Sequence, residues 1–245
     1  MKLEHKKILT LIATGTLLAA ATSVLAVGNA KLTKTRSLRS KTKRTSLSPL
    51  KDESSVMKSI LASTTGLQPN VLKLGLNAYK WANNHANVKK HYLTIIDFTI
   101  PSKQKRLWVI NLNTDKVVMK ELVANGKYSG LYNGTRFSNT PGSLQSSLGV
   151  YLTGVTYYGN DGLSLHVHGL QPGINSNAYS RTIEFHGANY VSPQFAKEYG
   201  RVGRSWGCFA LDKTIEPTLV DTIRGGSVVF AYANNHSQDF TVEGA

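Results

Sequence analysis

The spacing of apolar positions divides the chain into a helical part and a strand-rich part. Apolar residues recur at helical spacing in 53–64 and in 69–85, where Pro69 falls near the expected first turn. These two segments are therefore predicted to be helices that pack on a core. From residue 91 apolar and polar positions alternate with a period of two, which is typical of strands.

The strand-like segments follow one another with few long helices between them. Short helices are expected over 193–200 and 213–223, and strands are expected over 91–100, 105–112, 116–125, 148–158, 162–170, 181–187 and 226–234. Strands this frequent favour a mainly β fold, an antiparallel sandwich or barrel with a few short helices, preceded by an N-terminal helical segment.

The first 26 residues have the pattern of an export signal. MKLEHKK is short and basic, an apolar run follows, and Val24-Leu25-Ala26 offers a small-residue cleavage site. An uncleaved membrane anchor is the alternative, since about 20 apolar residues span a bilayer. Either way we expect an exported protein in the periplasm or cell envelope, soluble after cleavage or tethered to the membrane.

The charge of the chain is concentrated near its N-terminus. Ten basic residues and one acidic residue lie in 1–50, so nine of the fifteen net positive charges are there. Residues 27–51 are rich in Ser and Thr with little apolar periodicity, which predicts a disordered linker. Its stretch 31–51 would meet an anionic membrane or envelope surface, or serve as a tether without a partner. Nucleic acid is not expected, because the stretch lacks aromatic residues to stack bases.

These patterns predict five parts of the chain. In order they are a signal peptide over 1–26, the linker over 27–51, a helical segment over 52–90, a strand-rich domain over 91–235 and a tail over 236–245.

The single cysteine, Cys208, is either an inert apolar residue or a reactive thiol. His186 ends a predicted strand upstream, and an imidazole within hydrogen-bond reach would take the thiol proton. Arg201 and Arg204 add positive charge, which favours a thiolate. Gly207 removes a side chain where a substrate must approach, and backbone N–H groups near Gly207 and Cys208 would hold an oxyanion.

Four segments, taken in order, resemble the murein L,D-transpeptidase catalytic-domain family. They are TIIDFTIPSKQKRLWVINL, FSNTPGSLQSSLGVYLTG, GLSLHVHGLQPGINSNAYSRTIEFHGANYVS and GRVGRSWGCFAL, within Leu93 to Tyr232. The resemblance implies an L,D-transpeptidase-like β fold over 91–235 and action on peptidoglycan stem peptides. It implies no metal and no organic cofactor.

The resemblance also implies roles for individual residues. Cys208 is similar to the family's nucleophile and His186 to its base, while Gly187 completes the HG pair. Ser205 and Gly207 belong to the S-x-G-C loop that shapes the oxyanion site.

Arginines near these motifs are candidates for binding substrate. Arg204 is similar to a substrate-side arginine of the branch with a GRS-x-GC loop, and Arg181 and Arg201 are nearby in sequence. Arginine binds carboxylates in a bidentate manner, and stem peptides carry free carboxylates. The alternative is that these arginines pair with Glu184 and Glu198.

Three residues depart from the family pattern. Trp206 stands where many members have a second histidine, a change that this branch accepts. Phe209 stands where the branch usually has proline, so the geometry beside the thiol is in question. Gln171 replaces a usual glutamate.

The chemistry implied by the family is acyl transfer through a thioester. The Cys208 thiolate would attack the carbonyl of a diaminopimelate–D-alanine bond, and His186 would protonate the departing D-alanine. The amine of a second stem would then form a cross-link. With water as the acceptor, the enzyme would be an L,D-carboxypeptidase.

Other classes of site remain open from the sequence. His166 and His168 would share one strand face, and His186 would complete a metal site; two strand histidines that satisfy their own hydrogen bonds are the plainer alternative. Papain-type thiol peptidases place Cys before His, which is the reverse order. A sortase-like enzyme places His first and needs an arginine after the cysteine, a role open to Arg224.

A non-catalytic class is also open. Trp206 and Phe209 would fit an envelope-binding module whose thiol is disabled.

Overall fold

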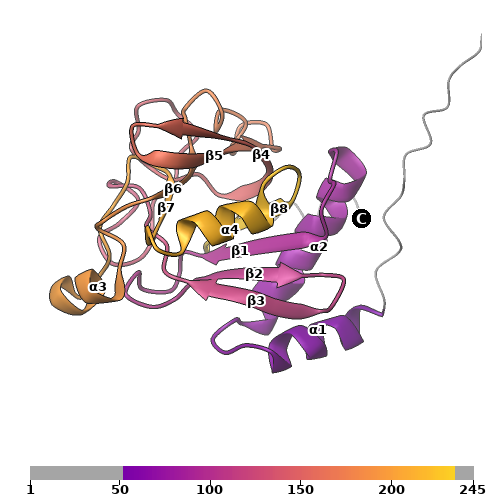
Figure 1. Ribbon diagram of the computed structural model, residues 1–245. Coiled ribbons are helices and arrows are strands. Elements are labelled where there is room, and N and C mark those ends of the chain that lie inside the picture. The colour runs from indigo at the N-terminus through magenta and orange to yellow at the C-terminus, as the bar shows by residue number, and fades with distance from the viewer. Residues whose placement is uncertain (1–51, 235–245) are drawn as a thin grey trace, which may run out of the picture. The chain divides into compact units, whose positions relative to one another are not determined.

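The computed structural model describes residues 52–234, which contain four helices and eight strands (Figure 1). The predicted signal, linker and tail over 1–26, 27–51 and 236–245 lie outside these residues. The elements, in chain order, are α1 (Glu53–Ala62), α2 (Pro69–His85), β1 (Tyr92–Asp97), β2 (Leu107–Asn111), β3 (Lys116–Glu121), β4 (Gly149–Gly159), β5 (Gly162–Gly169), β6 (Glu184–Gly187), α3 (Pro193–Tyr199), β7 (Phe209–Leu211), α4 (Glu216–Ile223) and β8 (Val228–Tyr232).

The strands form one curled sheet with the order β3-β2-β1-β8-β4-β5-β6-β7, so the prediction of a mainly β fold with a few short helices is confirmed (Figure 1). The expectation of purely antiparallel pairing is wrong at two places. β1 pairs with β8 in parallel, and β6 pairs with β7 in parallel. Parallel neighbours need a long crossover connection. The segment containing α3 provides it between β6 and β7, and therefore brings the loop before β7 back to β6.

An aromatic cluster fixes the short strand β7 in the core. The Phe209 side chain is fully buried, and its ring centroid lies 5.1 Å from that of Phe185 and 5.5 Å from that of Tyr151. Phe98 lies 6.3 Å away on another side. Aromatic pairs at such distances contribute about 1 kcal/mol each beyond the burial of their area. These contacts hold the three-residue strand β7 in place, and β7 in turn positions Cys208, the residue directly before it.

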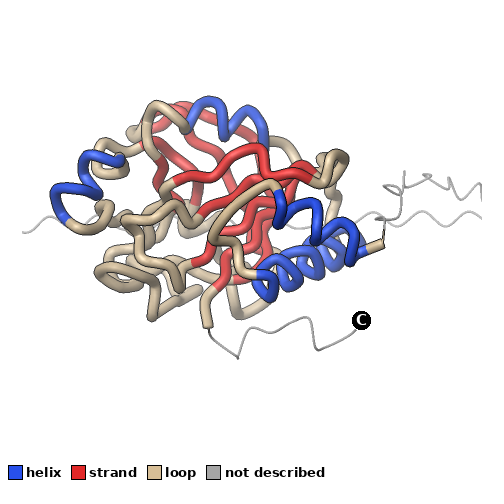
Figure 2. Tube along the Cα trace, turned by 90° about the horizontal axis from the view of Figure 1, so that it is seen from below, coloured by secondary structure: helices blue, strands red, loops and turns tan. Residues whose placement is uncertain are grey.

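The N-terminal helices belong to the same compact body as the sheet. The described residues, 52–234, all belong to one unit, and α2 packs on β1 and β8. The contact is close at Gly75, where an added Cβ would lie 2.6 Å from Cδ1 of Ile95. The strands, drawn in red, lie in the middle of the domain, and helices, drawn in blue, lie on opposite sides of them (Figure 2). Within 52–234, none of the helices combines the length and the apolar composition that crossing a bilayer requires.

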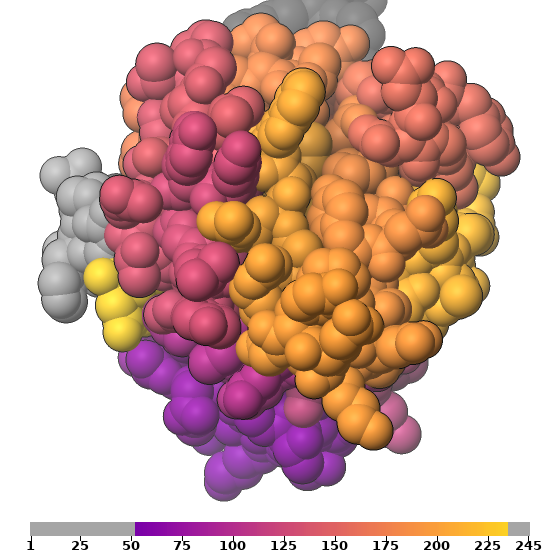
Figure 3. Space-filling model, turned by 90° about the vertical axis from the view of Figure 1, so that its left-hand side faces the viewer, coloured from indigo at the N-terminus to yellow at the C-terminus, as the bar shows by residue number. Residues whose placement is uncertain are grey.

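A buried arginine shapes the loop after β3. Arg106 is fully buried and donates to the carbonyl of Val123, to the carbonyl of Ile100 and, at 2.7 Å, to Oδ1 of Asn125. The next residue, Gly126, forms a parallel bridge with Ser205. The loop after β3 and the segment after β6 consequently lie side by side on one face of the molecule (Figure 3).

Candidate active site

The cysteine and the histidine singled out in the sequence come from two paired strands and the bend that leads into one of them. His186 of β6 is in register with Ala210 of β7. Cys208 lies two residues before Ala210, in the bend directly before β7. Both residues line one pocket with a volume of about 530 Å³. The strand β7, which creates this proximity, is absent from the sequence prediction because its three residues are too few to show a period.

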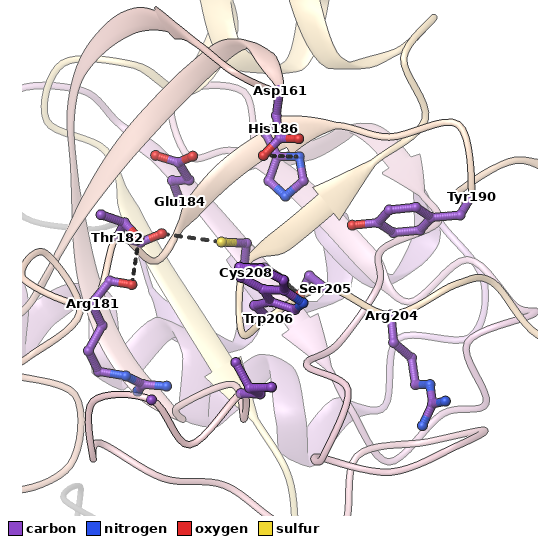
Figure 4. A pocket seen from close by; sticks show the side chains of 12 residues that line it. Asp161, Arg181, Thr182, Glu184, His186, Tyr190, Arg204, Ser205, Trp206 and Cys208 are labelled. Carbon is purple, nitrogen blue, oxygen red and sulfur yellow. Dashed lines mark hydrogen bonds and ion pairs between the residues drawn. The ribbon is translucent and has the colours of Figure 1, made fainter.

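The imidazole is oriented by a backbone carbonyl. Nδ1 of His186 lies 3.2 Å from the carbonyl oxygen of Gly187 and 3.9 Å from Oδ2 of Asp161. A proton on Nδ1 donates to that carbonyl, which leaves Nε2 as the acceptor. Figure 4 shows the ring above Cys208, with Asp161 behind Nδ1. The histidine is therefore set up to take a proton from the thiol side of the pocket.

The thiol itself points to a different partner. Sγ of Cys208 donates to the carbonyl oxygen of Thr182 at 3.2 Å, away from the imidazole (Figure 4). The pKa of Cys208 is raised to about 12, chiefly by desolvation on burial and to a smaller extent by the charges of Glu184 and Asp161, while a backbone hydrogen bond from Glu184 and the charge of Arg181 lower it. The expected activation of the thiol by Arg201 and Arg204 is not seen. In the free protein the thiol is protonated at neutral pH.

Backbone strain is concentrated beside the thiol. Thr182 and Leu144, both in the pocket wall, have φ of 53°, and the 52–234 region contains one further non-glycine residue with positive φ. A β-branched residue in this region of φ costs on the order of 1–3 kcal/mol. In this backbone conformation the carbonyl of Thr182 accepts the hydrogen bond from Sγ of Cys208, so the strained residue contacts the candidate site directly.

The loop before the cysteine is fixed by serine hydroxyls. Oγ of Ser205 donates to the carbonyl of Cys208 at 2.7 Å and accepts from the N–H of Gly207 at 3.1 Å. Oγ of Ser146 donates to the carbonyl of Gly207 at 2.9 Å. The N–H of Gly207 thus donates to Oγ of Ser205. The expectation that this N–H is free to hold an oxyanion is therefore corrected.

Gly207 has a role other than clearing space for a substrate. Its φ is 134°, and an added Cβ would lie 2.7 Å from Cδ1 of Ile183 and 2.8 Å from the carbonyl oxygen of Gln145. Only glycine adopts this φ without strain. The residue therefore allows the chain to turn tightly against Ile183 immediately before Cys208.

The arginines differ in their surroundings. Arg181 lines the pocket but is held by carbonyls and hydroxyls of the loop before β4: its Nη1 donates to the Ser138 carbonyl and its Nη2 to the Gln145 carbonyl at 2.6 Å. Arg204 also lines the pocket, and its Nη1 donates to the carbonyl of Lys127 at 2.9 Å. Neither pairs with Glu184 or Glu198.

Two residues expected to bind substrate are not in the pocket wall. Arg201 donates to the carbonyl of Val202 in its own segment. Gly187 is buried, where an added Cβ would lie 3.0 Å from Cγ of Lys213, and it acts through the carbonyl that orients His186.

Several pocket residues escaped the sequence analysis. Tyr190 lies in the third segment that resembles the family but received no role, Asp161 lies in the turn before that segment, and Glu184 was considered only as an arginine partner. Oε2 of Glu184 accepts from the Tyr157 hydroxyl at 2.6 Å and lies 3.9 Å from Nδ1 of His166. Glu184 also precedes His186 by two residues on β6, and this period was the signal that would have placed both in one site.

The structure weakens the competing assignments. The rings of His166 and His168 stack on Tyr157 and Tyr179, and no group of three or more metal-binding side chains occurs within 52–234. Arg224, the residue that a sortase-like site would need, pairs instead with Asp221 and is not in the pocket wall.

The three residues that depart from the family pattern lie in different surroundings. Phe209 is buried in the aromatic core, while Trp206 is 76% exposed at the pocket. Gln171 is buried, and its Oε1 accepts from the N–H of Val150 at 2.8 Å.

The chain belongs to the L,D-transpeptidase catalytic domain family, because the model of this family matches residues 63–232, well over half of the sequence. No curated protein sequence matches the chain.

Similar solved structures are also L,D-transpeptidases. One from Mycobacterium smegmatis is 14% identical, with 60% of this chain and 61% of that chain covered and a TM-score of 0.37. One from Stackebrandtia nassauensis is 15% identical, with 66% and 68% covered and a TM-score of 0.36. One from Mycobacterium tuberculosis H37Rv is 12% identical, with 58% of each chain covered and a TM-score of 0.34. The match therefore spans about three fifths of the mycobacterial chains.

Proposed function

We propose that this chain is a cysteine-dependent L,D-transpeptidase that transfers an acyl group of a peptidoglycan stem peptide through a thioester on Cys208. The observation that carries the proposal is that Cys208, directly before β7, and His186, within the neighbouring strand β6, line one pocket. Membership of the family supplies the substrate class, the stem peptides.

The first half-reaction forms the thioester. When a stem peptide fills the pocket, the Cys208 thiol rotates away from the Thr182 carbonyl and passes its proton to Nε2 of His186. The thiolate attacks the carbonyl of the diaminopimelate–D-alanine bond, and the imidazolium returns the proton to the D-alanine nitrogen as the C–N bond breaks. The Nδ1 contact to the Gly187 carbonyl stabilises the imidazolium that forms in between.

The second half-reaction releases the acyl group to an acceptor amine. The amine forms a C–N bond, the C–S bond breaks, and a proton from the nitrogen passes through His186 to sulfur. Arg204 is exposed on the pocket wall and offers N–H groups to a substrate carboxylate. We place this reaction in the periplasm or cell envelope, where the predicted export signal would deliver the chain.

The experiment that tests the proposal is a product assay. The purified chain is incubated with muropeptides that carry a tetrapeptide stem, and the products are separated and weighed by mass spectrometry. Release of D-alanine together with cross-linked dimers supports the proposal. Cys208→Ala, which keeps the fold because the thiol donates one hydrogen bond at most, removes both products. Intact tetrapeptide with the folded wild-type protein would refute the proposal.

A further inference from the structure

The pocket around Cys208 is divided by charge. The carboxylates of Glu184 and Asp161 lie on the same side of the thiol as His186, and the guanidinium groups of Arg181 and Arg204 lie on the opposite side (Figure 4). Desolvation is the main cause of the raised pKa of Cys208, and the two negative charges next to the thiol add to it, so they oppose its ionisation. This arrangement favours catalysis only if a cation enters the pocket during the reaction.

Glu184 is the part of this wall that is built to hold such a cation. Its side chain is 8% exposed, its Oε2 is held by the Tyr157 hydroxyl, and within 52–234 its Oε1 has no hydrogen-bond partner. Oε1 is not among the buried side-chain atoms without a partner within 52–234, so it remains open to the pocket, and a donor that enters there gains a charge-assisted bond to it. Tyr157 from β4 and His166 from β5 fix the carboxylate from behind.

Asp161 extends the negative wall from the tip of the β4–β5 hairpin. Its carboxylate is 62% exposed and lies 3.9 Å from Nδ1 of His186. Water screens the charge of an exposed carboxylate, so it attracts a bound cation less strongly than a buried carboxylate does. Asp161 therefore supports the binding of a cation that Glu184 anchors.

We propose that Glu184, assisted by Asp161, is the subsite that receives the attacking amine of the acceptor, which enters as a primary ammonium group adjacent to a free carboxylate. The proposal rests on the proposed function. Within 52–234 no carboxylate pairs with Arg204, so its guanidinium is available for the acceptor carboxylate at the opposite wall. A pocket with carboxylates on one wall and a guanidinium group on the other favours an acceptor that carries an ammonium group next to a carboxylate over water. The enzyme would then form cross-links rather than hydrolyse the thioester.

The proton balance of the second half-reaction fits this placement. The ammonium group loses one proton to the Glu184 carboxylate, and solvent then removes that proton. The neutral amine attacks the thioester and loses a second proton to Nε2 of His186, which passes it to the departing sulfur. The sum is thioester plus ammonium giving amide, Cys208 thiol and one released proton.

The test compares two nucleophiles on the same thioester. The full chain and its Glu184→Gln variant are incubated with tetrapeptide muropeptide, which acts as both donor and acceptor, and cross-linked dimer and tripeptide are quantified. We expect the ratio of dimer to tripeptide to fall about tenfold or more in Glu184→Gln, the effect of losing one charge-assisted bond. Hydroxylamine is a neutral nucleophile near pH 7, so its interception of the thioester should be equal in both proteins.

Controls separate the possible failures. Glu198→Gln removes a carboxylate outside the pocket and should keep the wild-type ratio, while Asp161→Asn should lower it less than Glu184→Gln. An unchanged ratio in Glu184→Gln with normal D-alanine release would overturn the subsite and leave the proposed function standing. An equal loss of hydroxylamine product would show general damage to the pocket and would also overturn it. Absence of D-alanine release from the wild type would instead refute the proposed function.

Discussion

Cys208 and His186 come from segments 22 residues apart, and they meet because β6 and β7 pair in parallel with His186 opposite Ala210. The cysteine stands immediately before the strand, where the loop opens into the pocket, and the histidine stands within its strand. Cys208 is thus held by a strand that Phe209 anchors in the core, and His186 by a strand inside the sheet.

The first prediction concerns the ionisation of the thiol. Because burial raises the pKa of Cys208 to about 12, the thiolate fraction of the free protein is very small at pH 7 and grows as the pH rises toward 12. Alkylation by iodoacetamide should therefore be slow at pH 7–8 and should show no plateau below pH 9. Cys208 is the only cysteine, so intact mass spectrometry reads its modification directly. A plateau below pH 8.5 would mean that the thiolate is stabilised in the free protein.

The second prediction concerns the base. His186→Gln keeps a side chain of similar length but cannot take the thiol proton, so release of D-alanine should fall about 10²–10⁴-fold. The circular dichroism spectrum should be unchanged. Asp161→Asn is the matched comparison, since it alters the more distant contact to Nδ1 and should retain most of the donor half-reaction. Equal losses in the two variants would argue that Asp161 is part of the proton-transfer unit.

The third prediction concerns the turn before the nucleophile. Gly207→Ala forces a Cβ to within 2.8 Å of a backbone carbonyl and requires a φ that alanine avoids, so unfolding should become easier by about 2 kcal/mol or more. Gly173 also has a positive φ, of 74°, but nothing lies within 4 Å of its added Cβ. Gly173→Ala should therefore cost only about 1 kcal/mol. Urea denaturation of both variants checks this, and equal costs would contradict the argument from packing.

The fourth prediction separates the two pocket arginines. Arg181→Gln removes the bonds that hold the loop before β4, so it should destabilise the protein by about 2 kcal/mol and also impair the reaction. Arg204→Gln removes one bond at the surface, so stability should change by less than about 0.5 kcal/mol while KM for the stem peptide rises. Thermal unfolding combined with kinetics distinguishes the two. A stable Arg181→Gln variant with only a raised KM would reverse the assignment.

The features that could be predicted from the sequence are those that leave a periodic pattern or a recognisable motif. The two helices, the strands around residues 91–125 and 148–170, and the shared location of Cys208 and His186 were all expected. The parallel pairing of β6 with β7 was not, because a strand of three residues has no measurable period and its position depends on the burial of Phe209 in a distant core.

The charges that surround the thiol were the other feature that could not be predicted from the sequence. Arg201 and Arg204 are near Cys208 along the chain, yet the side chains that govern its pKa are Glu184, Asp161 and Arg181, which the fold brings from other segments. Proximity in sequence therefore gave the wrong sign for the ionisation of the thiol.

The most direct test of the account is the mass of the protein during the reaction. The chain is mixed with a tetrapeptide muropeptide, quenched in acid within the first turnovers and weighed intact. We predict an adduct on Cys208 equal to the donor minus D-alanine, absent from Cys208→Ala and lost on treatment with hydroxylamine. A folded wild-type protein that releases D-alanine without ever carrying this mass would contradict the thioester mechanism.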